Sequence, residues 1–305
     1  MQLRRLRRRE SSLQSRRVDR RTILVAVLLA GTAAPLTAQW PAHRSAGAPR
    51  TADGKADMQG PVPRTRTGTP DLSGVWENIG WRELQARSND VSGTGGSPGT
   101  RPLVAAATGV LTSGPGLFFD IGADVAGGLP LTPWGAALKQ ERMAGNSKDN
   151  PDAHCLPLGN LQLHTHPQPR KMIQTADVIA MLYEGNGGVR QIFTDGRPLP
   201  ANDAQPWWFG YSSGRWDGDT LVVETRGFRD GGWLDVNGSP LTDRGRMTER
   251  FHRTSYGFMD VEVTVNDPQA YTRPWTVTIK QRLMPDDELI EFVCLENERS
   301  AKHFQ

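Results

Sequence analysis

Three features are missing from this chain, and each absence narrows what the protein can be. The apolar stretch at residues 23–30 is too short for a membrane span and no longer hydrophobic run follows it, so no stable membrane span is expected after the leader is removed. No glycine-rich nucleotide-binding loop occurs, and no cofactor is expected. We also detect no internal sequence repeat.

A net positive charge is found only at the beginning of the chain. Residues 1–38 hold nine Arg against one Glu and one Asp, although the whole chain has a net charge of only +3. The remaining residues therefore carry a net charge of −4. A nucleic-acid partner is not expected, because the basic isoelectric point comes from the leader rather than from a folded domain.

The first 38 residues are predicted to be a signal peptide. Arginine pairs precede a short apolar run, small residues follow it, and Ala38 offers a cleavage point before Gln39. The segment Arg20-Arg21-Thr22-Ile23-Leu24 resembles a twin-arginine signal, and an ordinary secretory signal is the alternative. No Cys lies near the cleavage point to carry a lipid anchor. The predicted location is periplasmic or secreted.

Cysteine is also scarce, with only Cys155 and Cys294 in the chain. An even number of cysteines in an exported protein favours one disulfide, because extracellular compartments are oxidising. Two separate buried thiols are the alternative.

Glycine and proline, in contrast, are abundant, at 33 and 22 residues, and they divide the chain. Residues 39–69 have almost no large apolar side chain and are predicted to be a disordered linker. A single domain is expected over 70–300, with a Gly-rich insertion at 88–128 that is either flexible or a lid. The best helix candidate is 132–142, with Thr132 as its cap.

From residue 172 onward the pattern is strand after strand. The clearest hairpin is Tyr211–Thr225, in which Asp217-Gly218 favours a tight type I′ turn. Successive hairpins without helical crossovers predict an all-β fold of about nine strands, an antiparallel up-and-down barrel. Further strands are expected at 178–184, 189–194, 246–253, 259–265, 275–283 and 289–295.

Two resemblances support a barrel. Gly74-Val75-Trp76 resembles the first-strand motif of lipocalins, in which the Trp closes one barrel end and stacks on an Arg; Arg282 is the expected partner here. The segment Gly214-Arg215-Trp216-Asp217-Gly218-Asp219-Thr220-Leu221-Val222-Val223-Glu224-Thr225, with His154-Cys155-Leu156-Pro157 and Glu291-Phe292-Val293-Cys294, resembles an uncharacterised family of exported bacterial proteins common in acidobacteria and proteobacteria. That resemblance covers most of residues 70–298 and implies an exported β protein without an established activity.

Charged residues at the strand ends are the candidates for catalysis. Paired carboxylates can act as general acid and base, and a neighbouring Arg can clamp an anionic group. Structural ion pairs at hairpin ends are the alternative, since Asp is common in turns for backbone reasons. The candidates are Asp195, Arg197, Asp235 and Glu249.

Aromatic and histidine side chains supply two further sets. Trp207, Trp208 and Tyr211, together with Arg197, are expected to share one rim of the barrel and bind a ligand, although Trp can equally fill a core. His164 and His166 have the spacing of two ligands on one strand face, with His154 as a possible third. Prolines around them favour a solvated loop over a metal site.

The sequence thus predicts an exported β-barrel that binds a small apolar, aromatic or sugar-like molecule. One alternative is a hydrolase or lyase on the same scaffold, using Asp/Glu and Arg. Another is an envelope interaction protein. The sequence does not decide whether the protein is an enzyme.

Overall fold

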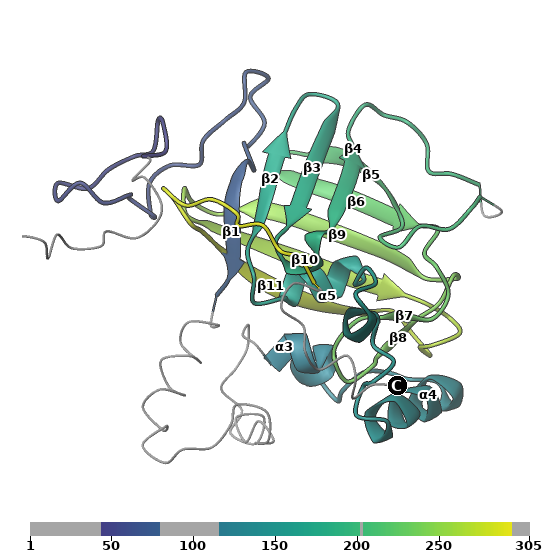
Figure 1. The fold of residues 1–305 in the computed structure, drawn as a ribbon. Coiled ribbons are helices and arrows are strands. Elements are labelled where there is room, and N and C mark those ends of the chain that lie inside the picture. Colours follow the sequence, from purple (N-terminus) through teal and green to yellow (C-terminus); the bar gives the residue numbers. More distant parts are fainter. Residues whose placement is uncertain (1–43, 80–115, 202–203, 295–305) are drawn as a thin grey trace, which may run out of the picture. The chain divides into compact units, whose positions relative to one another are not determined.

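Nine strands follow one another around a closed β-barrel in the computed structural model, which describes residues 44–79, 116–201 and 204–294 (Figure 1). These residues belong to the second of the two units into which the chain divides, Arg44–Gln305. The all-β barrel predicted from the sequence is confirmed. Its strands are β1 (Gly74–Asn78), β2 (Arg170–Gln174), β3 (Val178–Tyr183), β4 (Val189–Phe193), β5 (Tyr211–Asp217), β6 (Thr220–Arg226), β9 (Arg246–Arg253), β10 (Phe258–Asn266) and β11 (Trp275–Leu283).

One neighbouring pair in the ring is parallel, which a purely up-and-down barrel does not contain. Strands β4 and β5 run in the same direction, whereas the other neighbouring pairs are antiparallel. The strand number requires this, because a ring with an odd number of strands cannot alternate direction all the way round. The connection at 194–210 must therefore return along the barrel before β5 begins.

The tight turn between β5 and β6 lies one residue later than predicted. Asp217 pairs with Thr220, so the two central residues are Gly218 and Asp219. Gly218 has a φ of 58°, but Asp219 is not among the described residues with positive φ. A type I′ turn needs positive φ at both positions, so that prediction is wrong.

The first strand closes one end of the barrel with Trp76, which is fully buried. The guanidinium of Arg253 lies over its ring, 5.0 Å from the centroid. The prediction of Arg282 as the stacking partner is wrong. Arg282 follows an inward-facing residue on β11, so it points outward and bonds to Glu77.

Residues 44–73, here called the arm, are attached to the barrel and do not form the predicted free linker; residues 39–43 lie outside the described part. Arg50 donates two hydrogen bonds of 2.7 Å to Asp286, and Arg64 donates bonds of 2.9 and 2.6 Å to Asp219. The carbonyl of Gly60 accepts from the backbone of the β9–β10 turn. The composition misleads because the arm is ordered by turns, ion pairs and a few apolar contacts, of which Leu72 is fully buried.

The arm contains one segment twice, contrary to our expectation of no repeat. Residues 49–60 and 63–74 are identical at the Pro, Arg, Thr, Gly, Asp and Gly positions. Each copy forms the same internal backbone hydrogen bonds, including Thr51 to Lys55 and Thr65 to Thr69, both at 2.9 Å. The second copy leads into β1, so the first is a duplicate of the segment that starts the barrel.

Short helices gather at one end of the barrel (Figure 1). Helix α4 (Pro133–Ala144) matches the predicted helix, and the Thr132 hydroxyl accepts from Gly135 at 3.1 Å as its cap. Trp134 on α4 is 43% exposed. The other elements here are α3 (Gly116–Phe119), η2 (Ile121–Asp124), η3 (Pro151–His154), α5 (Asn160–Thr165), η4 (Gly185–Gly187), β7 (Gly232–Trp233) and β8 (Pro240–Leu241).

The end of the Gly-rich insertion is packed, not loose. Leu117 on α3 and Ile121 on η2 are at most 2% exposed and belong to the hydrophobic core. Residues 88–115 of the predicted insertion lie outside the described residues. Residues 116–128 therefore cover one end of the barrel.

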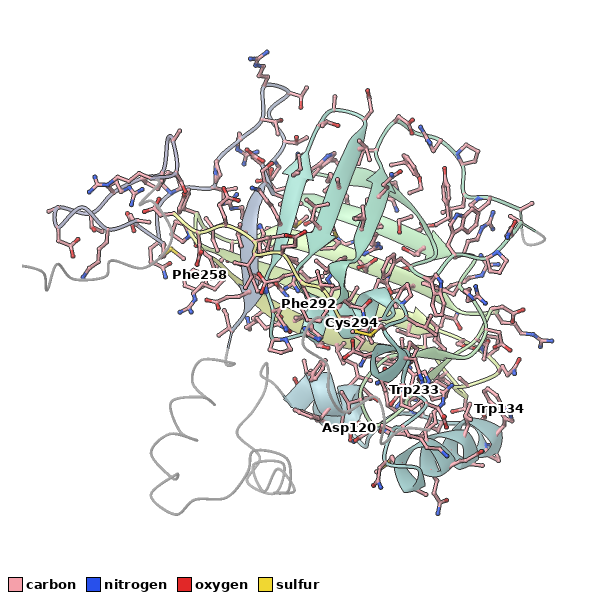
Figure 2. The ribbon with its side chains drawn as sticks, in the orientation of Figure 1. Asp120, Trp134, Trp233, Phe258, Phe292 and Cys294 are labelled. Atoms are coloured by element: carbon pink, nitrogen blue, oxygen red, sulfur yellow. A yellow bond between two sulfur atoms is a disulfide. The ribbon has the colours of Figure 1, made fainter. Side chains whose placement is uncertain are left out.

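Cys155 and Cys294 form a disulfide, as predicted (Figure 2). The bond joins η3 to the segment that follows β11. That segment is not the strand expected at 289–295, because residues 289–294 form none and Leu295 lies outside the described residues. Strand β1 already occupies the free edge of β11, so no edge is left for another strand.

Candidate functional site

Three ionisable side chains meet inside the barrel. His164 comes from α5, Arg190 from β4 and Glu249 from β9, and each is at most 2% exposed. The strands place them there by alternation. Arg190 is two residues from Ile192, and Glu249 stands between the inward-facing Met247 and Phe251.

The carboxylate of Glu249 joins the other two groups. Its Oε1 accepts from His164 Nε2 at 2.7 Å and from Arg190 Nη1 at 2.8 Å, while Oε2 accepts from Arg190 Nη2. Arg190 also donates to the hydroxyls of Ser212 and Thr225 at 2.9–3.1 Å. We call these five residues the interior cluster.

Protonation of the interior cluster follows from its charges. Burial alone would raise the pKa of Glu249, but the charge and hydrogen bonds of Arg190 outweigh it and hold that pKa at about 2. Burial lowers the pKa of His164 to about 4, against the opposing effect of Glu249. Glu249 is therefore ionised and accepts only, so Nε2 of the neutral His164 carries the proton and Nδ1 carries a lone pair.

Helix α5 is fixed in the barrel end by contacts at its C-terminal end. Every residue of α5 is buried. Arg170 donates to the carbonyls of Leu163 and His164 at 3.3 and 2.9 Å, which satisfies groups left free at a helix C-terminus. The amide of Asn78 donates to the carbonyl of His166 at 2.9 Å. The helix therefore presents fixed side chains to the interior.

Several buried polar atoms on or beside α5 have no hydrogen-bond partner among the described residues. His164 uses only one of its ring nitrogens, and Asn160, one turn earlier on the same helix face, uses neither amide atom. A buried polar atom left unpaired costs about 1–3 kcal/mol, so native proteins have few of them. The atoms are His164 Nδ1, Asn160 Oδ1 and Nδ2, Gln162 Oε1 and Gln281 Oε1.

Asp195 and Arg197 lie outside the barrel and bind each other. Arg197 Nε donates to both Asp195 oxygens at 2.9 Å, and Nη2 donates at 2.6 Å. The Arg197 guanidinium also lies 3.8 Å from the ring centroid of Phe193. These contacts use Nε and Nη2 of Arg197 and fix the loop after β4.

The aromatic residues predicted at the rim are divided between two places. The ring of Tyr211 contacts the rings of Trp207 and Phe193, with centroid distances of 5.3 and 5.2 Å. This contact lies on the outer face of the barrel, beside Arg197. Trp208 instead packs against Arg229, whose guanidinium carbon lies 4.6 Å from the centroid of the Trp208 ring. The predicted set therefore forms an outer aromatic group and one separate Trp, rather than one rim.

Asp235 is fully buried, and its carboxylate stabilises a loop by accepting hydrogen bonds. Its carboxylate accepts from Ile121 N at 2.8 Å and from the backbone and hydroxyl of Ser239 at 2.9 and 2.6 Å. Burial raises its pKa, and these hydrogen bonds oppose that rise. It joins η2 to the β7–β8 ribbon.

The three predicted histidine ligands do not converge. His154 is exposed on η3, His164 faces Glu249, and the ring of His166 packs on Phe118 at 4.9 Å. The strand spacing assumed for His164 and His166 does not apply, because His164 belongs to a helix that ends before His166. In the described part of the chain, no group of three or more His, Cys, Asp or Glu side chains could hold a metal ion.

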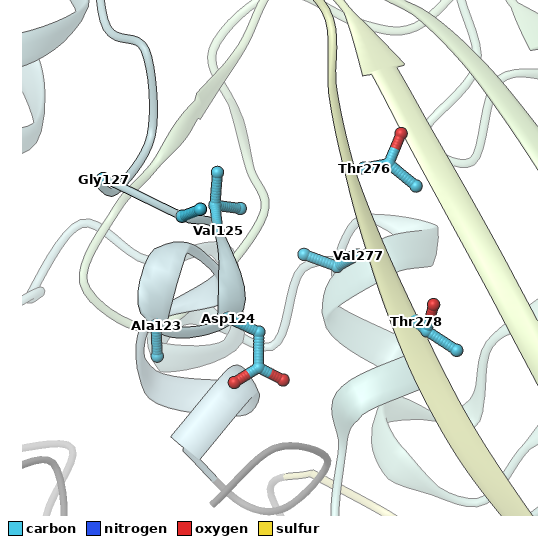
Figure 3. Close-up of a pocket in the computed structure, with 8 residues that line it drawn as sticks. Ala123, Asp124, Val125, Gly127, Thr276, Val277 and Thr278 are labelled. Atoms are coloured by element: carbon cyan, nitrogen blue, oxygen red, sulfur yellow. The ribbon is translucent and has the colours of Figure 1, made fainter. Parts of the chain in front are cut away.

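A separate groove of about 610 Å³ lies between η2 and β11. Figure 3 shows Asp124 and the hydroxyls of Thr276 and Thr278 on facing sides of it. Thr276 and Thr278 alternate with the inward-facing Val277, so the groove lies on the outer surface of the barrel. It does not include the interior cluster.

Sequence reasoning named Glu249 and His164 but missed Arg190, Asn160 and their arrangement. The sequence does contain a usable signal. Arg190 on β4 and Glu249 on β9 have opposite charges, and each occupies the same alternating positions as the buried apolar residues of its strand. Nothing in the sequence indicates that α5 enters the barrel end.

Comparison with known proteins yields no relative. No family model matches the chain, and neither the curated proteins nor the solved structures contain a match. No helix in the described ranges is both long and apolar enough to span a membrane.

Proposed function

We propose that this chain is an exported barrel protein that binds a small molecule inside the barrel, beside α5 and the interior cluster. The observation that carries the proposal is the set of unpaired buried atoms on α5. A bound molecule that pairs with them offsets their desolvation, which is a common reason for retaining such groups.

The surrounding wall suits a small molecule with an apolar or aromatic body. The rings of Tyr183 and Phe251 lie 6.0 and 5.9 Å from the ring of His164. Met181 and Ile192 are fully buried on the neighbouring strands. Barrels of this size can hold one such ligand.

The outer aromatic group is the weaker location. Arg197 is already paired with Asp195, and the pair is exposed to solvent. A ligand there would have to displace an existing ion pair in competition with water.

Native mass spectrometry of the exported protein tests this location. The wild type should carry a small bound molecule, and Asn160→Leu should lose it, because Leu has a similar size but no amide. Trp207→Leu, on the outer face, is the matched control and should keep the molecule. The opposite result, loss in Trp207→Leu alone, would place the site outside the barrel.

Stability provides a check that Asn160→Leu is folded. Replacing an unpaired amide with an apolar side chain removes a desolvation cost of about 1–3 kcal/mol, so the free energy of unfolding should not fall. Asn78→Leu is the comparison, because both amide atoms of Asn78 are bonded, at 2.9 Å to His166 and to Gln281. It should be destabilised.

Export is supported by the leader pattern and by the disulfide, which persists in oxidising compartments. The mature protein should begin near Gln39. N-terminal sequencing that finds Met1 retained in a cytoplasmic form would contradict export. Membership of the exported bacterial family stays a prediction.

A lyase or hydrolase is the second candidate, and His164 favours it. A carboxylate that holds one ring nitrogen and leaves the other with a lone pair is the arrangement of a general base. The molecule that co-purifies, incubated with fresh protein, should then be converted, and His164→Gln should bind it without conversion. If the wild type binds the molecule without converting it, the enzyme proposal fails and only the binding function remains.

A further inference from the structure

The hydrogen-bond capacity that is left unused inside the barrel is mainly acceptor capacity. Nδ1 of His164 is an acceptor, because Nε2–H is committed to Glu249 at 2.7 Å. The opposite tautomer would point a lone pair at an ionised carboxylate. A partner for Nδ1 must therefore donate a hydrogen.

Two glutamines add acceptors in the same region. Gln281 donates from Nε2 to Asn78 at 2.9 Å, and its Oε1 is unpaired. The Nε2 of Gln281 also lies 3.5 Å from the carbonyl of His164, which places Gln281 beside α5. On α5 itself, Gln162 Oε1 is unpaired. Only Asn160 adds a donor to the unpaired buried atoms of α5.

The cationic side chains nearby are engaged by acceptors of the protein. Arg190 donates to Glu249, Ser212 and Thr225. Arg170 donates to the carbonyl groups at the end of α5. An incoming carboxylate would have to displace these bonds and would also meet the charge of Glu249.

We propose that the ligand is an uncharged molecule bearing hydroxyl or N–H groups, a phenol, alicyclic alcohol or sugar, whose donors pair with His164 Nδ1 and the glutamine oxygens. This inference rests on the proposed function and deepens it. The apolar wall accounts for the body of the molecule, and the acceptors account for its substituents. Carboxylates and ethers of the same size lack the donor.

Matched probes test the donor directly. Binding is measured by thermal shift and by ligand-observed NMR for three sets: phenol, anisole and benzoate; 2-naphthol, 2-methoxynaphthalene and 2-naphthoate; methyl glucoside and its permethylated form. In at least one set the hydroxyl member should bind about tenfold more tightly than its methylated partner, the loss expected for one hydrogen bond. The carboxylates should bind least.

Substitutions at His164 and Gln281 test whether their acceptor atoms cause the preference for the hydroxyl over the ether. His164→Phe keeps a ring without the nitrogen, and it should reduce the advantage of the hydroxyl over the ether. Arg197→Ala, on the outer face, should leave that advantage unchanged. If His164→Phe does not fold, Gln281→Met provides the same test at the second acceptor.

The outcomes separate the two proposals. Ethers or carboxylates that bind as tightly as the alcohols overturn the donor preference and leave interior binding intact. A preference that survives both interior substitutions overturns the assignment to these acceptors. If no probe binds and no molecule co-purifies, both the inference and the proposed function fail.

Discussion

Glu249 is the residue on which the interior cluster depends, because its buried charge is compensated by a direct ion pair with Arg190. Burying a charge is costly, and the cost is offset only while its partner and hydrogen bonds stay in place. The carboxylate is fully buried and is held by both Arg190 and His164. Removing one side of this pair should therefore be far worse than removing both.

We predict that Arg190→Met lowers the free energy of unfolding by about 3–5 kcal/mol, since it leaves the carboxylate of Glu249 unpaired. Adding Glu249→Gln should recover much of the loss, because Gln still accepts from His164 but carries no charge. Chemical denaturation of the two single variants and the double variant measures the coupling. Equal losses that simply add would show that the two residues do not interact.

The second prediction concerns how the stability of the fold depends on pH, through His164 and His166. Burial lowers the pKa of each to about 4, while an unfolded chain protonates them near the ordinary value of 6.5. The unfolded state therefore binds protons that the folded state excludes. Stability should be fully present above pH 6.5 and fall as the pH drops toward 4.

Each of these histidines contributes a slope of about 1.4 kcal/mol per pH unit in that window. Urea titrations at several pH values should show the slope, and replacing His164 with Gln should remove about half of the histidine part. Glu249, with its depressed pKa, adds its own loss only below about pH 4.5. An unchanged slope in the variant would mean that folded His164 takes up a proton normally.

At the scale of residues, the sequence indicates chemistry better than it indicates position. It singled out Glu249, yet also Asp195, because both are acidic residues on or just after strands. Which acid is buried depends on strand phase and on which side of the barrel faces inward. Asn160 could not be predicted, because its importance arises only from α5 entering the barrel end.

The arm is the element whose behaviour departs most from its composition. The first copy, residues 49–60, attaches through a partly exposed ion pair and backbone hydrogen bonds, and its Ala56 and Met58 are only partly buried against the core. The second copy places Leu72 in the core and accepts a hydrogen bond from the Trp76 ring at 3.0 Å. The two copies should therefore differ greatly in what they contribute to stability.

A mature chain shortened to begin at Pro61 should keep the barrel, with a melting temperature lowered by less than about 5 °C, the shift of one or two weak contacts. A chain shortened to begin at Gly74 also loses residues 61–73, and Leu72 with them. That chain should melt much earlier or fail to fold. Thermal unfolding followed by circular dichroism compares them, and equal melting temperatures would refute the distinction.

Local signals predicted most elements well. Helix α4 starts at its Thr cap, and the hairpins of β5–β6 and β9–β10 follow from alternating patterns. The failures have physical causes. The expected strand at 289–295 has an alternating pattern but no free edge to pair with, and edge availability is a property of the closed ring.

For the whole molecule, the disulfide makes a further prediction. Cys155 and Cys294 are separated by 139 residues, so the bond restricts a long stretch of the unfolded chain. Replacing both with Ala should lower the free energy of unfolding by about 2–4 kcal/mol.

Denaturant titration of the double Cys→Ala variant measures this loss of unfolding free energy. Mass measurement after alkylation provides the control. The denatured wild type should take up no alkylating group before reduction. Two modified thiols in the non-reduced protein would contradict the bond.

Strand order around the barrel has a consequence for how the chain is made. Strand β1 pairs with β2 on one side and β11 on the other, so it stays open on the second side until β11 exists. The ribosome adds about 5–20 residues each second, and roughly 200 residues lie between the two strands, so the gap lasts about 10–40 s. During that time the nascent chain exposes strand edges that the finished ring does not have. This interval is when chaperones that bind extended chains can engage it, before closure removes the edges.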